Sequence, residues 1–182
     1  MKKFPFTHYP SLIIVVQEKQ ITNQPDISDF SKVSDRGRIL ALDLGTKKVG
    51  AAVCDEMQLT VRPLETIVRK SWKELLKKIV SFIEEFDAVA LVLGLPYNYD
   101  GSESDMSREA RRLARNFSLS LSIPVFLQDE RLTTKSAQQF LYDEGFNESE
   151  ILKKVDSVAA TIILSDFLAL KDETRQKTKR RD

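Results

Sequence analysis

The 182-residue sequence predicts an α/β fold in which helices cover both faces of a mixed β-sheet. Short apolar runs with short connections between residues 39 and 68 predict an antiparallel meander. Further along the chain, apolar runs alternate with segments of helical spacing, which predicts parallel strand–helix units. The composition, with 42% hydrophobic residues, 30% charged residues and one cysteine, is typical of one globular domain without a disulfide.

The meander is predicted from three segments, which are Ile39–Leu42, Ala51–Cys54 and Leu64–Val68. The first segment is continuously apolar, which is typical of a strand that is buried on both faces. Gly45 and Gly50 flank the short connection that follows it. Connections this short favour antiparallel pairing between neighbouring strands.

Two helices and two strands are expected after the meander. Ser71 and Glu74 have the spacing of a capping box, so a helix is expected to begin there. The apolar run Ala88–Leu93, which ends at Gly94, predicts a central strand, and Ile123–Leu127 predicts the next one. The two helices are marked by apolar residues at helical spacing. These are Trp72, Leu75, Leu76, Ile79, Val80 and Ile83 in the first helix, and Met106, Ala110, Leu113, Ala114 and Phe117 in the second.

Two more helices are expected near the C-terminus. The third helix is marked by Ala137, Phe140 and Leu141 and is expected to end at Gly145, because glycine is the usual residue after a helix. The last helix is expected from a second set of apolar residues at helical spacing. These are Val155, Val158, Ala159, Ile162 and Ile163.

The chain divides into three regions by composition. Residues 1–37 lack a sustained period and predict a loosely ordered extension, whereas residues 38–170 predict the folded domain. Residues 171–182 carry six basic residues, three acidic residues and no apolar residue, which predicts a basic, frayed tail. No apolar run approaches the roughly 20 residues that a membrane-spanning helix needs, so no membrane partner is expected.

Acidic residues occur at strand ends and at the start of the last helix. Asp43 ends the first buried strand, and Asp129 and Glu130 follow the strand at residues 123–127. Asp156 lies in the opening turns of the last helix. An α/β sheet can gather such residues at one edge, and hard cations prefer carboxylate oxygens as ligands. Taken singly, each acid also fits a structural role, either as a turn cap or as a favourable charge at a helix start.

Four sequence blocks stand out in this order along the chain: Ala41–Gly50, Val92–Pro96 with Asp100–Gly101, Asp129–Thr134 and Val155–Ala160. Together they resemble the YqgF (RuvX) family, whose members are described as Holliday junction resolvases or pre-16S ribosomal RNA nucleases. The resemblance covers residues 38–170. Three positions depart from the family pattern: Lys48 stands where arginine is usual, and Tyr97 and Tyr99 replace an aliphatic residue and a methionine.

The resemblance implies a ribonuclease H-like fold, a cytoplasmic location and a divalent metal, which is Mg2+ with Mn2+ as an alternative. By position the implied catalytic acids are Asp43, Glu130 and Asp156. All three are also expected to bind the metal, and Asp129 is a rival to Glu130 as a ligand. The implied reaction is hydrolysis of a phosphodiester by metal-activated water. The only histidine, His8, lies in the extension, so no histidine is expected to serve as a general base.

Family members are described as nucleases that mature the 5′ end of the small-subunit ribosomal RNA precursor. The expected substrate is therefore this RNA, with branched DNA as the alternative. A non-catalytic module that binds RNA or a transcription factor is a further alternative. An actin-like ATPase shares the start of the pattern, but a core of about 133 residues is short for two lobes. The sequence chooses neither between RNA and DNA nor among oligomeric states.

Seven basic residues are candidates for binding nucleic acid. Four arginines recur at i, i+3, i+4 and i+7 on the second predicted helix, opposite its apolar stripe, and predict a solvent-facing basic row. Such a row can contact successive phosphates, although a plain solvated helix face has the same pattern. The other three lie beside the candidate acids, where they could equally balance the charge of the carboxylates. The seven residues are Arg108, Arg111, Arg112 and Arg115, and Lys47, Lys48 and Arg131.

Overall fold

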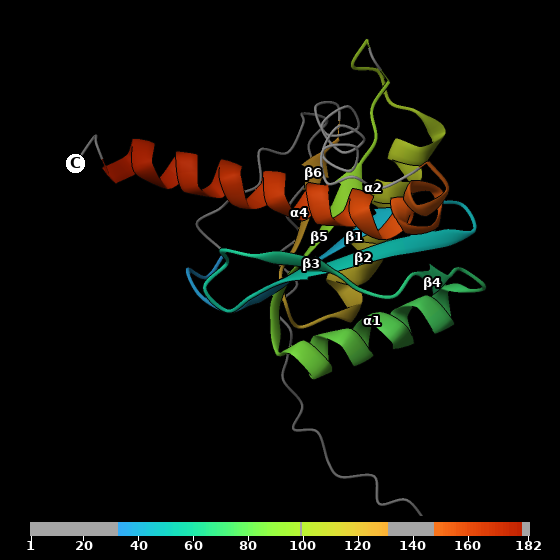
Figure 1. Cartoon of the computed structure of the whole chain (residues 1–182), viewed down its shortest axis with the longest axis horizontal. Helices are drawn as coiled ribbons and strands as arrows, with labels where there is room; N and C mark the ends of the chain where they lie inside the picture. The colour runs from blue at the N-terminus through green and yellow to red at the C-terminus, as the bar shows by residue number, and fades with distance from the viewer. Residues whose placement is uncertain (1–32, 99, 131–147, 180–182) are drawn as a thin grey trace, which may run out of the picture.

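The computed structural model describes the backbone of residues 33–98, 100–130 and 148–179, and their side chains except at 148–157 and 178–179. In this part of the chain, six strands form one sheet with helices on both faces (Figure 1). The strands are β1 (Arg38–Leu44), β2 (Lys48–Cys54), β3 (Val61–Pro63), β4 (Ile67–Val68), β5 (Ala88–Leu95) and β6 (Val125–Asp129). The helices are α1 (Trp72–Phe86), α2 (Asp105–Ser120) and α4 (Glu148–Lys179).

The sheet is mixed, as the sequence predicts. Its order is β3-β2-β1-β5-β6, and β4 pairs with β2 outside this path. Strand β2 is antiparallel to β1, β3 and β4, whereas β1, β5 and β6 are parallel to one another. An antiparallel meander is therefore followed by parallel strand–helix units, because the crossovers through α1 and α2 return the chain to the same edge.

The third predicted strand, at Leu64–Val68, is wrong in detail. The structure has two short strands instead, β3 and β4, which pair with opposite ends of β2. Pro63 ends β3, and a proline has no backbone N–H with which to continue a ladder. The N–H of Leu64 donates to the carbonyl oxygen of Ala51 at 2.8 Å, and the chain then crosses to β4.

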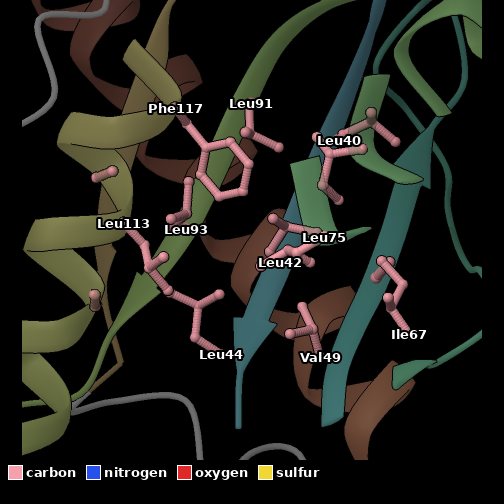
Figure 2. Close-up of a cluster of buried hydrophobic side chains, with 14 of the residues drawn as sticks. Leu40, Leu42, Leu44, Val49, Ile67, Leu75, Leu91, Leu93, Leu113 and Phe117 are labelled. Atoms are coloured by element: carbon pink, nitrogen blue, oxygen red, sulfur yellow. The ribbon is translucent and has the colours of Figure 1, made fainter. Parts of the chain in front are cut away.

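Side chains of the central strands alternate between two hydrophobic cores. Leu40, Leu42 and Leu44 of β1 lie in the core under α1 and α2, of which Figure 2 gives a close view. Ile39 and Ala41 lie in the core under α4. The same alternation runs along β5, where Leu91, Leu93 and Leu95 lie in the first core, and Ala90 and Val92 in the second. This alternation fixes the face on which a residue at a strand end lies.

The cap of α1 lies where the sequence predicts it, whereas the cap of α2 was not predicted. The side chain of Ser71 caps α1 by accepting a hydrogen bond from the N–H of Glu74 at 3.2 Å. At α2, Ser104 and Ser107 form a reciprocal capping box. Both serine hydroxyls also donate to the carbonyl oxygen of Pro96. These bonds tie the start of α2 to the segment that leaves β5.

Helix α4 continues further than the sequence predicts. It is helical to Lys179, whereas a frayed tail was expected from Lys171 onward, so that expectation is wrong over residues 171–179. Lys171 is buried, and its ammonium donates to the side-chain oxygen of Gln58. Arg175 donates to the carbonyl oxygen of Val33 at 2.9 Å, and Val33 is itself buried in the core under α4. These contacts hold the last turns of the helix against the segment that precedes β1.

Other predicted segments lie partly outside the described residues. Residues 1–32 of the expected extension do so, and so does the third helix expected around residues 137–145. Cys54 is buried, as expected of a core residue. The ring of Trp72 packs on the ring of Phe117, with centroids 4.8 Å apart. None of the described helices is long and apolar enough to cross a membrane.

Candidate active site

Asp43 is the acid at the carboxyl end of the central strand β1. Its register partner is Gly50 of the neighbouring strand β2. Ile39 and Ala41, four and two positions earlier, lie in the core under α4, so strand alternation puts Asp43 on the same face. Asp43 is half-buried. The carboxylate therefore belongs to the edge of the sheet that α4 covers.

Glu130 reaches this face from the far side of β5. It follows the last residue of β6, and its N–H donates to the carbonyl oxygen of Leu95 at 3.3 Å. A Cβ built on Gly94 of β5 would lie 2.8 Å from the carboxyl carbon of Glu130 and 2.6 Å from Cδ1 of Ile163. Ile163 is a buried residue of α4. The Glu130 carboxyl group therefore lies over β5, beneath α4.

Asp129, the rival to Glu130, belongs to the opposite face by strand alternation. It pairs in register with Leu95, whose side chain lies in the core under α1 and α2. Leu127, two positions earlier on β6, lies in the same core. Asp129 nevertheless remains close enough for its charge to act on Glu130. The structure thus brings Glu130, rather than Asp129, onto the face that carries Asp43.

Burial and like charge act together on Glu130. Burial, followed by the nearby charges of Asp43 and Asp129, raises the pKa of the Glu130 carboxyl to about 8. A carboxyl in this setting is held protonated near neutral pH unless a cation joins it. Perturbed acids of this kind are enriched at functional sites.

Asp156 lies in the backbone of α4, but its side chain is outside the part that the structure describes. The helix runs antiparallel to β1: Ile163 lies beside Gly94, and Lys171 lies beside Gln58, which bonds to Gly37 just before β1. The N-terminal half of α4 is therefore directed toward the carboxyl ends of the parallel strands. Among the side chains that the structure describes, no three potential ligands form a complete metal site.

The basic candidates fall into two groups. Lys47 and Lys48 are exposed in and after the turn that follows Asp43. Arg131 lies outside the described residues. The lysines thus flank the candidate acids from the solvent side, where a phosphate could reach them.

The four arginines of α2 do not form a uniform solvent-facing row. Arg108 pairs with Asp105, and Arg112 pairs with Glu109, although both arginine side chains are about 60% exposed. Arg115 is exposed. They remain available at the surface, but an acid one turn away offsets the charge of each of the first two arginines.

Arg111 differs from its neighbours on α2 because it is largely buried. Its side chain is 15% exposed and pairs with Glu103 at 2.6 Å. It also donates to the hydroxyl of Tyr97. Within the part of the chain that the structure describes, its Nη1 atom is buried without a hydrogen-bond partner. Arg111 therefore packs against the segment that follows β5, and the expectation that it faces solvent is wrong.

Two residues beside the acids were missed in the sequence. Arg69 donates to the carbonyl oxygen of Gly45 and pairs with Glu109 of α2, so it ties the turn after Asp43 to the helix. The paired arginines lower the pKa of Glu109 to about 2. Gly94 provides the space in which the Glu130 carboxyl lies. A glycine ending an apolar strand run is the one signal of this in the sequence, since such glycines often mark a close approach.

These features define a class of protein: an α/β protein of ribonuclease H-like topology, with acids gathered at the carboxyl ends of its parallel strands. Residues 37–170 match the RuvX family, which is described as Holliday junction resolvase. This match covers well over half of the sequence, and the chain belongs to the RuvX family. The resemblance read from the four sequence blocks is thereby confirmed.

Curated relatives cover most of the same region. A protein of Syntrophus aciditrophicus (strain SB) named "Putative pre-16S rRNA nuclease" is 40% identical over 131 residues, which are 72% of this chain and 87% of that protein. A protein of the same name from Zymomonas mobilis is 36% identical over 149 residues, which are 81% and 91% of the two chains.

Solved structures with a similar fold are more distant. RuvC of T. thermophilus in complex with a Holliday junction substrate has a TM-score of 0.43 at 13% identity, covering 70% of this chain and 91% of that one. The fowlpox virus Holliday junction resolvase has a TM-score of 0.44 at 11% identity, covering 72% and 98%. At these identities the likeness concerns the fold alone.

Proposed function

We propose that this protein is a metal-dependent nuclease that hydrolyses phosphodiesters, with the 5′ end of the pre-16S ribosomal RNA precursor as its substrate. The observation that carries the proposal is the partly buried carboxyl of Glu130, which lies on the same sheet face as Asp43 and within reach of its charge. The substrate rests on the names of the curated relatives. A cytoplasmic location belongs to the same proposal.

The donor set fits a divalent cation. Hard cations such as Mg2+ and Mn2+ prefer carboxylate oxygens, and Asp43 and Glu130 present two carboxyl groups from the ends of strands β1 and β6, which lie on either side of β5. The like charges that raise the pKa of Glu130 leave negative charge for a cation to compensate. Asp43 and Glu130 are the favoured ligands because they lie on the same face of the sheet. Asp129 is the weaker candidate because it belongs to the other face.

Asp156 is the third acid of the proposed site. It is four residues before Ala160 and seven before Ile163, both of which are buried against the sheet. Residues at this spacing share one stripe of a helix. Two helical turns separate Asp156 from Ile163, a rise of about 10 Å toward the strand ends that carry the acids. The spacing therefore supports Asp156 as a ligand.

The chain's own residues prepare the reaction in three ways. Asp43 and Glu130 hold their oxygens on one face of the sheet, and the raised pKa keeps a proton on Glu130 in the metal-free protein. Lys47 and Lys48 are exposed beside the acids and bind the phosphates on either side of the cut. When bound, a divalent cation supplies a water of lowered pKa and neutralises charge on the phosphate.

The family description favours a second substrate for the same chemistry, a four-way DNA junction. The test is one cleavage panel of structured precursor RNA, single-stranded RNA and four-way DNA junctions, each with Mg2+, Mn2+ or a chelator. We expect cleavage of the precursor RNA with metal and none with chelator. Preferred cleavage of the junction would replace the RNA by DNA as the substrate.

Asp43→Asn and a matched control complete the panel. Asp43→Asn is expected to abolish cleavage and to leave the fold intact, because it removes a charge at a solvent-accessible edge. Asp172→Asn makes the same change at an exposed position of α4 and is expected to cleave as the wild type does. Metal-independent RNA binding with no cleavage of any substrate would reject the proposal in favour of a non-catalytic module.

A further inference from the structure

Gly94 is the point of closest approach between β5 and the acid that comes from β6. A Cβ built there would lie 2.6 Å from Cδ1 of Ile163 and 2.8 Å from the carboxyl carbon of Glu130, with Oε1 of Glu130 closer still. Side-chain Cβ atoms essentially never approach a neighbour within 3.0 Å. The space of the missing side chain is therefore filled by the Glu130 carboxyl on one side and by α4 on the other.

The requirement at this position is for space, not for a special backbone conformation. Among the described residues the glycines with positive φ are Gly37 and Gly101, whereas Gly94 is an ordinary strand residue in register with Gln128. Any residue could adopt the backbone of Gly94. Only glycine leaves room for the carboxyl group above it.

The path of the Glu130 side chain explains why this room is needed. Glu130 stands one position past the end of β6, and its N–H is held by the carbonyl oxygen of Leu95. To approach Asp43 on β1, its side chain must cross the intervening strand β5. Gly94 lies on this path, on the face that α4 covers.

We propose that Gly94 is a positioning residue: the absence of a side chain at this point of β5 lets the Glu130 carboxyl lie across the strand toward Asp43. The inference rests on the proposed function for its consequence, which is that Gly94 and Glu130 act as one unit in holding the cation. It extends the functional set to a residue that bears no functional group.

The first test is the Gly94→Ala variant of the full chain, examined by crystallography and by Mn2+ titration. We expect the Glu130 carboxyl to be displaced from the space above residue 94 and the Mn2+ affinity to fall about 10- to 100-fold, as when a group that orients a ligand is lost. A Glu130 carboxyl in its wild-type position, with unchanged Mn2+ affinity, would overturn the inference.

Ile163→Val separates displacement of Glu130 from simple overpacking. This substitution removes Cδ1, the atom of Ile163 that a Cβ at residue 94 would meet. Alone, it is expected to leave Mn2+ affinity unchanged. Combined with Gly94→Ala, it should recover thermal stability but not Mn2+ affinity. Full recovery of Mn2+ affinity in this double variant would show that the helix contact alone matters, and would overturn the inference.

Glu130→Asp provides a second, independent arm. The shorter side chain lacks the reach to cross β5, so we expect weaker Mn2+ binding whatever residue stands at position 94. Adding Gly94→Ala to Glu130→Asp should then produce no further loss, because the two residues act as a unit. Losses that multiply in the double variant would contradict the inference.

The outcomes distinguish this inference from the proposed function. If the wild type binds no Mn2+ and cleaves no substrate, the proposed function fails. The displacement of Glu130 in crystals of Gly94→Ala still decides the positioning role. If the wild type is active and Gly94→Ala matches it in both readouts, the inference fails while the proposed function stands.

Discussion

Two ionisable side chains, Lys171 and Glu130, lie along the face of the sheet that α4 covers, and their surroundings differ. Lys171 is 3% exposed, and its ammonium donates to the side-chain oxygen of Gln58. The amide of Gln58 in turn donates to the carbonyl oxygens of Ser34 at 3.2 Å and Gly37 at 2.9 Å. At the other end of the face, Glu130 is partly buried beside two further acids.

The difference separates a charge that we assign to the structure from an acid that we propose is functional. The Lys171 ammonium meets a neutral acceptor whose amide nitrogen is itself bonded to two carbonyl oxygens, so groups of the chain itself surround this charge. Glu130 meets like charges, which raise its pKa where an opposite charge would lower it. A fold that keeps such an acid is weaker for it until something outside the chain binds there.

The largest expected effect comes from a substitution of Glu130. Glu130→Gln should lower cleavage about 100-fold or more, because it removes a ligand charge. It should also raise the unfolding free energy of the metal-free protein at pH 8 by about 1–3 kcal/mol, because a neutral amide avoids the burial cost. Activity assays and urea unfolding measure the two effects. Glu84→Gln, at an exposed position of α1, is the control and should change neither.

Substitutions near Lys171 should have the opposite effect, with lower stability and unchanged activity. Gln58→Ala removes the acceptor of Lys171 and the donor to two carbonyl groups, so we expect a loss of about 2–3 kcal/mol in unfolding free energy. Activity per folded molecule should stay at the wild-type level. Lys171→Met should cost less, since it removes the buried charge together with its need for a partner. Lost activity in the folded Gln58→Ala variant would contradict the structural role that we assign to Gln58 and Lys171.

The pH dependence of stability sharpens the comparison. The Glu130 pKa is about 8 in the folded protein, above its ordinary value, so the native state holds a proton that the unfolded chain releases. Stability of the metal-free protein should therefore fall by about 1–2 kcal/mol as the pH rises from 5 to 8. Burial also raises the pKa of Asp166, so the difference between wild type and Glu130→Gln isolates Glu130. A difference that does not change with pH would refute this account.

The smallest expected effect concerns Arg111, whose side chain is largely buried. Among the described residues, some of its guanidinium nitrogens have hydrogen-bond partners, whereas Nη1 has none. Tyr97→Phe removes the hydroxyl that accepts from Arg111 and adds to the unpartnered guanidinium atoms. We expect a loss of about 0.5–1.5 kcal/mol in unfolding free energy, measured by urea titration. Unchanged stability in Tyr97→Phe would mean that water replaces the hydroxyl.

The central sheet could be predicted from the sequence because its signal is local. Continuous apolar runs such as Ile39–Leu42 and Ala88–Leu93 identify strands buried on both faces. The split of the third predicted strand into β3 and β4 could not be predicted, because it depends on where each segment pairs with β2. The helical residues 171–179 were missed since a buried lysine and a bonded arginine look like solvated charges in the sequence.

The candidate site was predictable in type but not in arrangement. Acids at strand ends indicated which residues to consider, and the roles of Asp43, Glu130 and Asp156 stay predictions. The choice between Asp129 and Glu130 depends on the pairing register at the end of β6. A shift of one position would move each of the two side chains to the opposite face of the sheet. The pairing of the α2 arginines depends on side-chain geometry that helical spacing alone does not contain.

The length of α4 sets a distance scale for any long ligand. The helix extends past the sheet at its C-terminal end (Figure 1). Fourteen residues separate Ile163, beside the acids, from Lys177, an axial rise of about 21 Å. A polynucleotide that touches both ends must span this rise, which equals about six nucleotide steps of 3.4 Å along a duplex strand. Shorter oligonucleotides reach the acids without ever meeting the cations at the end of the helix.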